Sequence, residues 1–127
     1  MGSVTGSISI AAPVGEVFAV VSDPERLPDW CTDFARASRR DGDHWTVDTP
    51  FGPVEVRSTA DRGTGVVDFR VISEYGDHQA FTRLIPVSDT ETEFVFTRLF
   101  GAGEGEAEAP QLLSIIEGRL KTLSTLF

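Results

Sequence analysis

Most of the chain alternates between apolar and polar positions in short runs that are separated by turn residues. Val4, Ile8 and Ile10 alternate with polar or small residues, and this period of two predicts a half-buried strand over residues 4–11. Six further runs lie between Gly, Pro and Asp turns, and they predict strands over residues 34–39, 44–49, 54–60, 66–73, 79–86 and 92–100. The pattern therefore predicts seven strands, of which the last six form an antiparallel meander.

Two short helices are predicted between the first and second strands. The apolar residues of the segment 14–21 fall on one helical face. Asp23 and Pro24 then match the N-cap and the first turn of a second helix, where an aspartate accepts a free N–H and a proline has none to leave unpaired. We expect Pro28 to end this second helix, because proline cannot continue a helical hydrogen-bond pattern.

The segment 110–127 is the long stretch whose apolar residues keep a helical period. Its stripe consists of Leu113, Ile116, Leu120, Leu123 and Phe127, at steps of three and four residues. One cation, Arg119, projects inside this apolar arc. We therefore predict a long C-terminal helix that covers the sheet, with Ile116 and Leu120 fully buried and Gly118 on the solvated side.

Length, composition and charge indicate one soluble globular domain over residues 1–127. Within it, the small, acidic and glycine-rich segment 101–109 is expected to be a mobile connector to the last helix. Twenty acidic and eleven basic residues give a net charge of −9, which disfavours nucleic acid and anionic membranes as partners. Cys31 is the single cysteine, and no stretch approaches the ~20 apolar residues that span a bilayer. We expect a cytoplasmic monomer or homodimer without membrane insertion.

The opening of the chain resembles a known superfamily. The motif Ile8-x-Ile10-x-Ala12-Pro13-x-x-x-Val17-Phe18, followed by Ser22-Asp23-Pro24-Glu25-Arg26-Leu27-Pro28-x-Trp30, is similar to the start of the polyketide cyclase/dehydrase and lipid-transfer superfamily, which is START-like and birch-pollen-allergen-like. The resemblance implies an α+β helix-grip fold, in which a seven-stranded curved antiparallel sheet surrounds a long C-terminal helix and two short helices separate strands 1 and 2. Members include aromatase/cyclases, lipid or quinone carriers, hormone receptors and chaperone activators, so the resemblance specifies fold rather than function.

The period of two also predicts which side chains face the long helix. We assign to this inward face Trp45, Val47, Val54, Val56, Val67, Phe69, Val71, Phe81, Ile85, Phe94 and Phe96. On this assignment Arg83 and Arg98 also point inward, and Arg119 approaches from the helix. A buried guanidinium needs a partner. The partner is either a ligand or an acid from the helices or loops, with the nearest candidates being Glu16, Asp29 and Asp33.

These residues predict a pocket between the sheet and the long helix for a small, mostly apolar molecule that bears a carbonyl, enolate or carboxylate group. Arg83, helped by Arg119, is the candidate catalytic residue that would orient or stabilise this oxygen. We expect Trp30 to lie partly buried at the entrance, because the chain turns there into a strand. The full set of candidate ligand-binding residues is Trp30, Phe34, Trp45, Phe69, Tyr75, Phe81, Phe96, Arg98, Ile116, Arg119 and Leu120.

Three functions use such a pocket differently. An enzyme would cyclise, dehydrate or rearrange its substrate, a carrier or sensor would hold the ligand without reaction, and a partner-binding module would have a filled core. A large open cavity with several polar groups favours the enzyme, a dry apolar cavity the carrier, and no cavity the partner module. His44 and His78 lack Cys, Asp or Glu at ligand spacing, and the glycines form no phosphate loop, so we expect neither metal nor cofactor.

Overall fold

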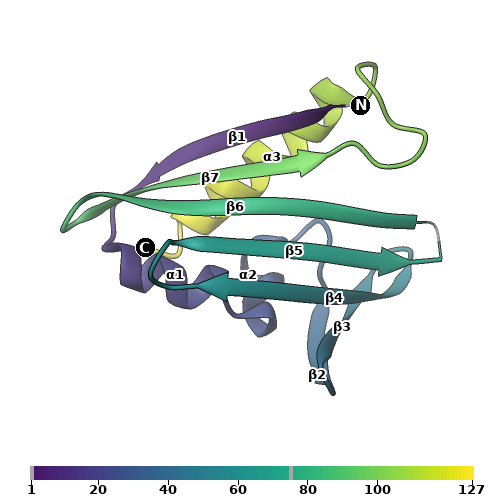
Figure 1. Cartoon of the computed structure of the whole chain (residues 1–127), viewed down its shortest axis with the longest axis horizontal. Helices are drawn as coiled ribbons and strands as arrows, with labels where there is room; N and C mark the ends of the chain where they lie inside the picture. The colour runs from purple at the N-terminus through teal and green to yellow at the C-terminus, as the bar shows by residue number, and fades with distance from the viewer. Residues whose placement is uncertain (1, 75) are drawn as a thin grey trace.

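Seven strands form one antiparallel sheet in the computed structural model, which describes residues 2–74 and 76–127. In chain order they are β1 (Ser3–Ile10), β2 (Ala37–Asp41), β3 (His44–Thr49), β4 (Gly52–Asp61), β5 (Val66–Ser73), β6 (Gly76–Ser88) and β7 (Glu91–Leu99). Their order across the sheet is β1-β7-β6-β5-β4-β3-β2, so the first strand lies beside the last (Figure 1). The predicted α+β helix-grip fold with seven strands is confirmed.

Two short helices follow β1, as predicted. They are α1 (Val14–Val21) and α2 (Leu27–Trp30), with a 3-10 turn (Pro24–Arg26) between them. Asp23 caps this turn, since its carboxylate accepts a hydrogen bond from the backbone N–H of Glu25 at 3.0 Å. Pro28 lies in the first turn of α2 and does not end a helix as expected, because the first turn has no use for the missing N–H.

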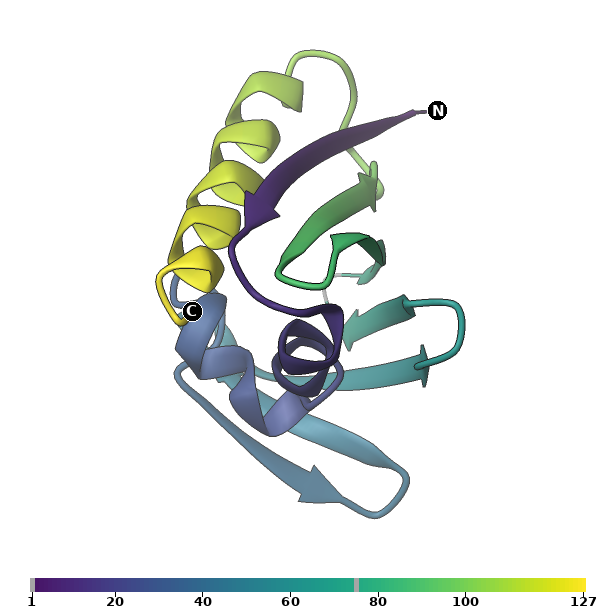
Figure 2. The ribbon, with the colours of Figure 1, turned by 90° about the vertical axis from the view of Figure 1, so that its left-hand side faces the viewer.

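The C-terminal helix α3 (Ala109–Ser124) lies along β1 on the concave side of the sheet (Figure 2). Ile116 and Leu120 are fully buried, as predicted. The approach is so close that a Cβ atom on Gly6 of β1 would lie 3.0 Å from Cγ2 of Ile116 and 3.4 Å from Cδ1 of Leu120. Glycine at this position therefore allows the helix to reach the strand.

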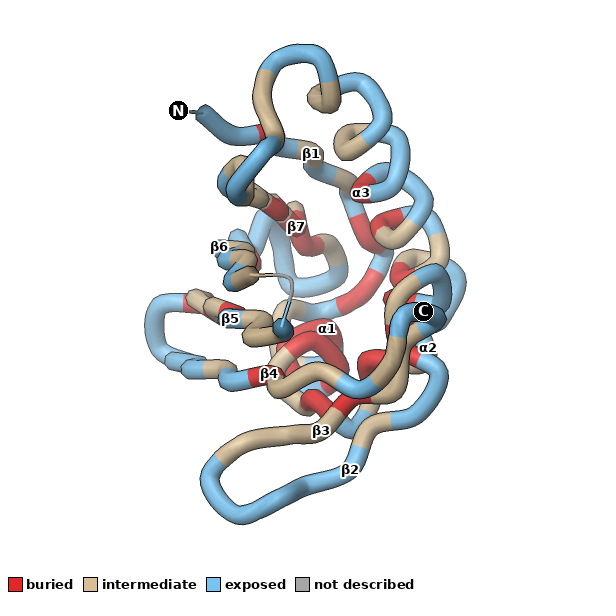
Figure 3. Tube along the Cα trace, turned by 90° about the vertical axis from the view of Figure 1, so that its right-hand side faces the viewer, coloured by how far each residue is buried: buried red, intermediate tan, exposed pale blue. Residues whose placement is uncertain are grey.

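The buried residues gather where the helices meet the sheet (Figure 3). At one end of the concave face α1 contacts β6 and β7, and Leu84 and Phe94 pair there across the two strands. Val67 and Val56 continue this layer on β5 and β4. The core therefore fills one end of the curved sheet, and the site described below lies at the other.

Strand β6 presents the opposite face from the one predicted. Thr82 and Leu84 are buried, whereas Phe81, Arg83 and Ile85 are exposed. Arg83 therefore lies on the convex, solvated side of the sheet. The expectation that Arg83 and Phe81 face the pocket is wrong.

The partners of β6 explain this orientation. Thr82 lies opposite Val67 of β5, and Leu84 lies opposite Phe94 of β7, and both partners point inward. Side chains that are paired across an antiparallel sheet share a face. The hydroxyl of Thr82 donates to the carbonyl oxygen of Val67 at 2.6 Å, so its burial leaves no unpaired polar group.

Candidate functional site

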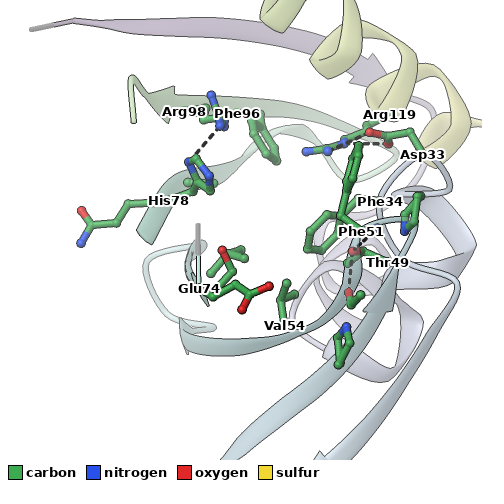
Figure 4. Close-up of a pocket in the computed structure, with 17 residues that line it drawn as sticks. Asp33, Phe34, Thr49, Phe51, Val54, Glu74, His78, Phe96, Arg98 and Arg119 are labelled. Atoms are coloured by element: carbon green, nitrogen blue, oxygen red, sulfur yellow. Dashed lines mark hydrogen bonds and ion pairs between the residues drawn. The ribbon is translucent and has the colours of Figure 1, made fainter. Parts of the chain in front are cut away.

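A cavity of about 830 Å³ opens at the end of the concave face away from α1. Its floor is formed by the start of β4, the end of β5, the start of β6 and the end of β7, which antiparallel pairing brings to one end of the sheet. The loop after α2, the β3–β4 turn at residues 49–52 and α3 supply the other walls (Figure 4). The cavity is thus built from segments that lie far apart in the sequence.

Much of the cavity wall is apolar. Phe34, Val54, Val71, Ala80 and Phe96 line it, and all but Phe96 are only partly buried. These side chains leave apolar surface in contact with water when the cavity holds no ligand. Covering such surface stabilises a bound apolar molecule by roughly 25 cal/mol per Å².

Phe51 adds an exposed aromatic surface to the cavity. Its side chain lies at the tip of the β3–β4 turn, is 86% exposed and lines the cavity. Thr49 holds this turn together, because its hydroxyl donates to the carbonyl oxygen of Gly52 at 2.6 Å and accepts from the Phe51 N–H at 3.2 Å. The turn therefore presents one large aromatic side chain at the mouth of the cavity.

Arg119 of α3 and Asp33 of the loop after α2 form the first polar cluster of the wall. Nε and Nη2 of Arg119 donate to the two carboxylate oxygens of Asp33, each at 2.9 Å. The guanidinium also lies 5.8 Å from the centre of the Phe34 ring. Burial alone would lower the pKa of Arg119, but the hydrogen bonds and charge of Asp33 raise it overall. One of the predicted loop acids therefore neutralises the helix cation.

Arg98, Glu104 and His78 form the second polar cluster. Nη1 of Arg98 donates to Oε1 of Glu104 at 2.9 Å, and Nη2 lies 3.0 Å from Nδ1 of His78. The pKa of His78 is lowered, first by burial and then by the charge of Arg98, against the weaker effects of Glu104 and Asp77. Burial would raise the pKa of Glu104, but hydrogen bonds from Arg98 and from the Gly101 N–H lower it overall. Figure 4 shows Arg98 and His78 well apart from Arg119 and Asp33.

The candidate residues from the sequence are divided between the cavity and the core. Phe34, Phe96, Arg98 and Arg119 line the cavity. Trp45 and Phe69 face the concave side but are not among the described residues that line it, and Ile116 and Leu120 belong to the buried core. Tyr75 lies outside the residues that the structure describes.

Trp30 is not at the entrance, and the expectation that it is only partly buried is wrong. Its side chain is 1% exposed and meets the rings of Phe94 and Phe96 edge-on, with centroids 5.9 and 6.4 Å away. The short helix α2 ends with Trp30 on its buried face, where it joins the core. The next turn of the chain places Asp33 and Phe34 at the cavity in its place.

Several functional candidates were missed from the sequence. His78 was not identified as a cavity residue because the strand was predicted to begin at residue 79. In the structure β6 begins at Gly76 and includes His78. His78 lies two residues before Ala80 on this strand, so the two side chains are on the same face of the sheet. Phe51 could have been noticed, since an aromatic residue between Pro50 and Gly52 in a turn has no core to fill. Glu74, in the turn directly after β5, also lines the cavity.

Two classes of feature are not found in the described part of the chain. Residues 2–74 and 76–127 contain no group of three or more His, Cys, Asp or Glu side chains placed to hold a metal ion. Within the same residues, none of the helices has the length and apolar character needed to cross a bilayer.

The whole sequence, residues 1–127, matches the profile of the family described as polyketide cyclase/dehydrase and lipid transport. The chain belongs to this family. The resemblance noted in the sequence is therefore confirmed, and the family supports a role in binding a hydrophobic small molecule. A search of curated proteins finds none with significant sequence similarity.

Solved structures show how the family fold is shared. An uncharacterized protein from Bacillus thuringiensis has a TM-score of 0.82 at 16% identity, over 99% of this chain and 98% of that chain. A START superfamily protein from Mycobacterium smegmatis has a TM-score of 0.73 at 14% identity, over 97% and 94%. BexL, a di-domain ARO/CYC from the BE-7585A biosynthetic pathway, has a TM-score of 0.77 at 14% identity, over 98% of this chain and 46% of BexL. At these identities the similarity shows the fold alone.

Proposed function

We propose that this protein binds a small, mostly apolar molecule bearing a carbonyl or carboxylate group in the cavity, and that it catalyses cyclisation or dehydration of that molecule. The observation that carries the proposal is the cavity of about 830 Å³, which combines apolar walls with two fixed polar clusters. A volume of this size is in the range of small-molecule sites. The family description and the similarity to the di-domain ARO/CYC support the choice of reaction class.

The arrangement of the cavity suits a reaction in which shape does much of the work. A flexible chain that is folded against Phe34, Val54 and Phe96 has fewer conformations to lose before two of its carbons meet. The polar clusters at Arg98 and Arg119 lie on separate walls, so they can fix the orientation of a ligand with polar atoms at two positions. Hydrogen bonds held in place before reaction stabilise charge that develops on a carbonyl oxygen.

Both alternative functions can be weighed against the same cavity. A partner-binding module with a filled core does not account for an open space of this volume. A carrier needs an apolar cavity but has no need of two ion-paired clusters in its wall, which cost desolvation energy to place there. The polar clusters therefore favour the enzyme.

The binding step can be tested with N-phenyl-1-naphthylamine, an uncharged probe whose fluorescence rises in apolar surroundings. Ala80 lies on the floor of the cavity, so Ala80→Phe should fill it and weaken probe binding by at least ~10-fold, about 1.4 kcal/mol. Ala60→Phe is the matched control, because Ala60 is exposed on β4 and outside the cavity lining. Circular dichroism and thermal unfolding verify that both variants are folded. Absence of probe binding to the wild type, or equal binding by both variants, would contradict the proposal.

A further inference from the structure

The charges in the cavity wall already compensate one another. Nη1 of Arg98 donates to Oε1 of Glu104 at 2.9 Å, and Nη2 donates to Oε2 at 3.3 Å. The carboxylate of Glu104 therefore contacts two nitrogens of the guanidinium. Arg119 is held in the same two-bonded way by Asp33. Neither guanidinium is left with an uncompensated charge that would attract an anion.

Glu74 adds a negative charge to these two compensated pairs. It lines the cavity, and it forms no ion pair with any residue in the described part of the chain. Asp33 and Glu74 line the cavity with the two guanidiniums, and Glu104 pairs with Arg98, on a protein whose net charge is −9. An anionic ligand would enter an unfavourable potential, and each guanidinium that it could reach already has its charge compensated by a carboxylate.

His78 offers a hydrogen bond without a charge. A guanidinium has donors only, so Nδ1 of His78, 3.0 Å from Nη2 of Arg98, must be the acceptor in that hydrogen bond. The imidazole is then neutral and carries its hydrogen on Nε2. The lowered pKa of His78, caused by burial and by Arg98, agrees with the neutral form.

The position of the His78 ring is fixed from two sides. A Cβ atom on Gly101 would lie 2.8 Å from both Cε1 and Nδ1 of the imidazole, so the backbone of Gly101 packs against the ring. Glu104 holds both neighbours, since it pairs with Arg98 and accepts the Gly101 N–H at 2.7 Å. Nε2 makes no hydrogen bond with any described residue and is not a buried unpaired atom, while the ring itself lines the cavity. Its N–H is therefore available.

From these contacts we infer that the cavity selects an uncharged ligand, and that the Nε2–H of His78 donates a hydrogen bond to its carbonyl oxygen. The inference rests on the proposed function and narrows it, because it favours a ketone or aldehyde over a carboxylate. His78 is a binding residue here and does not act as a base, since Arg98 occupies the nitrogen that would accept a proton. Such a hydrogen bond should strengthen binding of the carbonyl compound by ~3–10-fold.

Three probes of one ring system test the inference by displacement of N-phenyl-1-naphthylamine: 2-ethylnaphthalene, 2-acetylnaphthalene and 2-naphthoate. We expect the ketone to bind ~3–10-fold more tightly than the hydrocarbon, and the carboxylate to bind at least ~10-fold more weakly than the ketone. The preference for the ketone over the hydrocarbon should disappear in His78→Phe. It should persist in His78→Gln, whose amide can donate to the ligand and accept from Arg98.

Each outcome has one meaning. Tighter binding of 2-naphthoate than of the ketone would overturn the selection of an uncharged ligand, and an intact ketone preference in His78→Phe would overturn the role of His78. Nitrogen-15 chemical shifts of the imidazole provide a readout without ligand, since hydrogen on Nδ1 in place of Nε2 would also overturn that role. In each of these cases the uncharged probe still binds and the proposed function stands. Failure of N-phenyl-1-naphthylamine to bind would overturn the proposed function and the inference together.

Discussion

Cys31 shows how burial decides the chemistry of a single residue. Its thiol is buried immediately after α2, and this burial raises its pKa to about 12, with Arg119 lowering it and Asp33 raising it by smaller amounts. The thiolate is the reactive form of cysteine. The residue therefore belongs to the core and is not a nucleophile of the neighbouring cavity.

The prediction for Cys31 concerns its reactivity in the native protein. At about pH 8 we expect an aromatic disulfide reagent to modify the native protein at least ~10³-fold more slowly than the same protein in urea, because both the thiolate fraction and access are low. The absorbance of the released aromatic thiol measures the rate. A native rate close to that of the unfolded chain would show that Cys31 is accessible or ionised.

Arg119 and Asp33 form one ion pair but differ in their contact with water. The side chain of Arg119 is 17% exposed, whereas that of Asp33 is 45% exposed. Without its partner, the exposed carboxylate of Asp33 can be hydrated by water. The more buried guanidinium of Arg119 cannot be fully hydrated when it loses Asp33. The two residues should therefore respond differently to the loss of their partner.

We expect Asp33→Ala to lower the free energy of unfolding by ~1–3 kcal/mol, because it leaves the guanidinium of Arg119 buried without a carboxylate. Arg119→Met should change it by less than ~1 kcal/mol, since methionine keeps the apolar stem and Asp33 turns to water. In the Arg119→Met background, Asp33→Ala should cost almost nothing. Urea titrations of the four proteins measure these differences, and equal costs for the two single substitutions would contradict the argument.

At the scale of elements, α3 has one face that carries the stability of the molecule. Leu120 is fully buried against β1, whereas Gly118 is exposed, with nothing within 4 Å of the place where a Cβ would be added. We expect Leu120→Ala to cost ~2–5 kcal/mol because it leaves a cavity in the core. Gly118→Ala should be neutral or stabilise the protein by up to ~1 kcal/mol, since alanine favours the helix. Similar effects of the two substitutions in a denaturant titration would mean that the buried face is wrongly assigned.

Strand β6 marks the limit of what periodicity can predict for an element. It has apolar residues in both phases, with Phe81 and Ile85 in one and Leu84 in the other, so alternation alone does not choose its inward face. The inward face of β6 is determined by its pairing with β5 and β7, whose Val67 and Phe94 point inward. The charge of Arg83 could have identified the outward face of β6. If the residues in phase with Arg83 pointed inward, its guanidinium would be buried inside the protein. In β3, β4, β5 and β7, alternation predicted the inward face correctly.

At the scale of the whole molecule, the sequence could predict the elements but not where they leave space. The family resemblance and the apolar stripe of 110–127 predicted the sheet and the helix inside it. How closely α3 approaches β1 depends on its contact with Gly6, more than a hundred residues away in the chain. The sequence could therefore name Phe34 and Arg119 as cavity residues but could not bring His78 to the same cavity.

The pairing of the first strand with the last has a consequence for how the protein is made. β1 leaves the ribosome first, but its partner β7 follows roughly 80 residues later, which at about 5–20 residues per second is a delay of about 4–16 s. The meander from β2 to β6 can form meanwhile from neighbouring segments, whereas β1 cannot. During that time its alternating apolar residues have no native partner, so β1 is the strand most exposed to chaperones and to mispairing with another molecule.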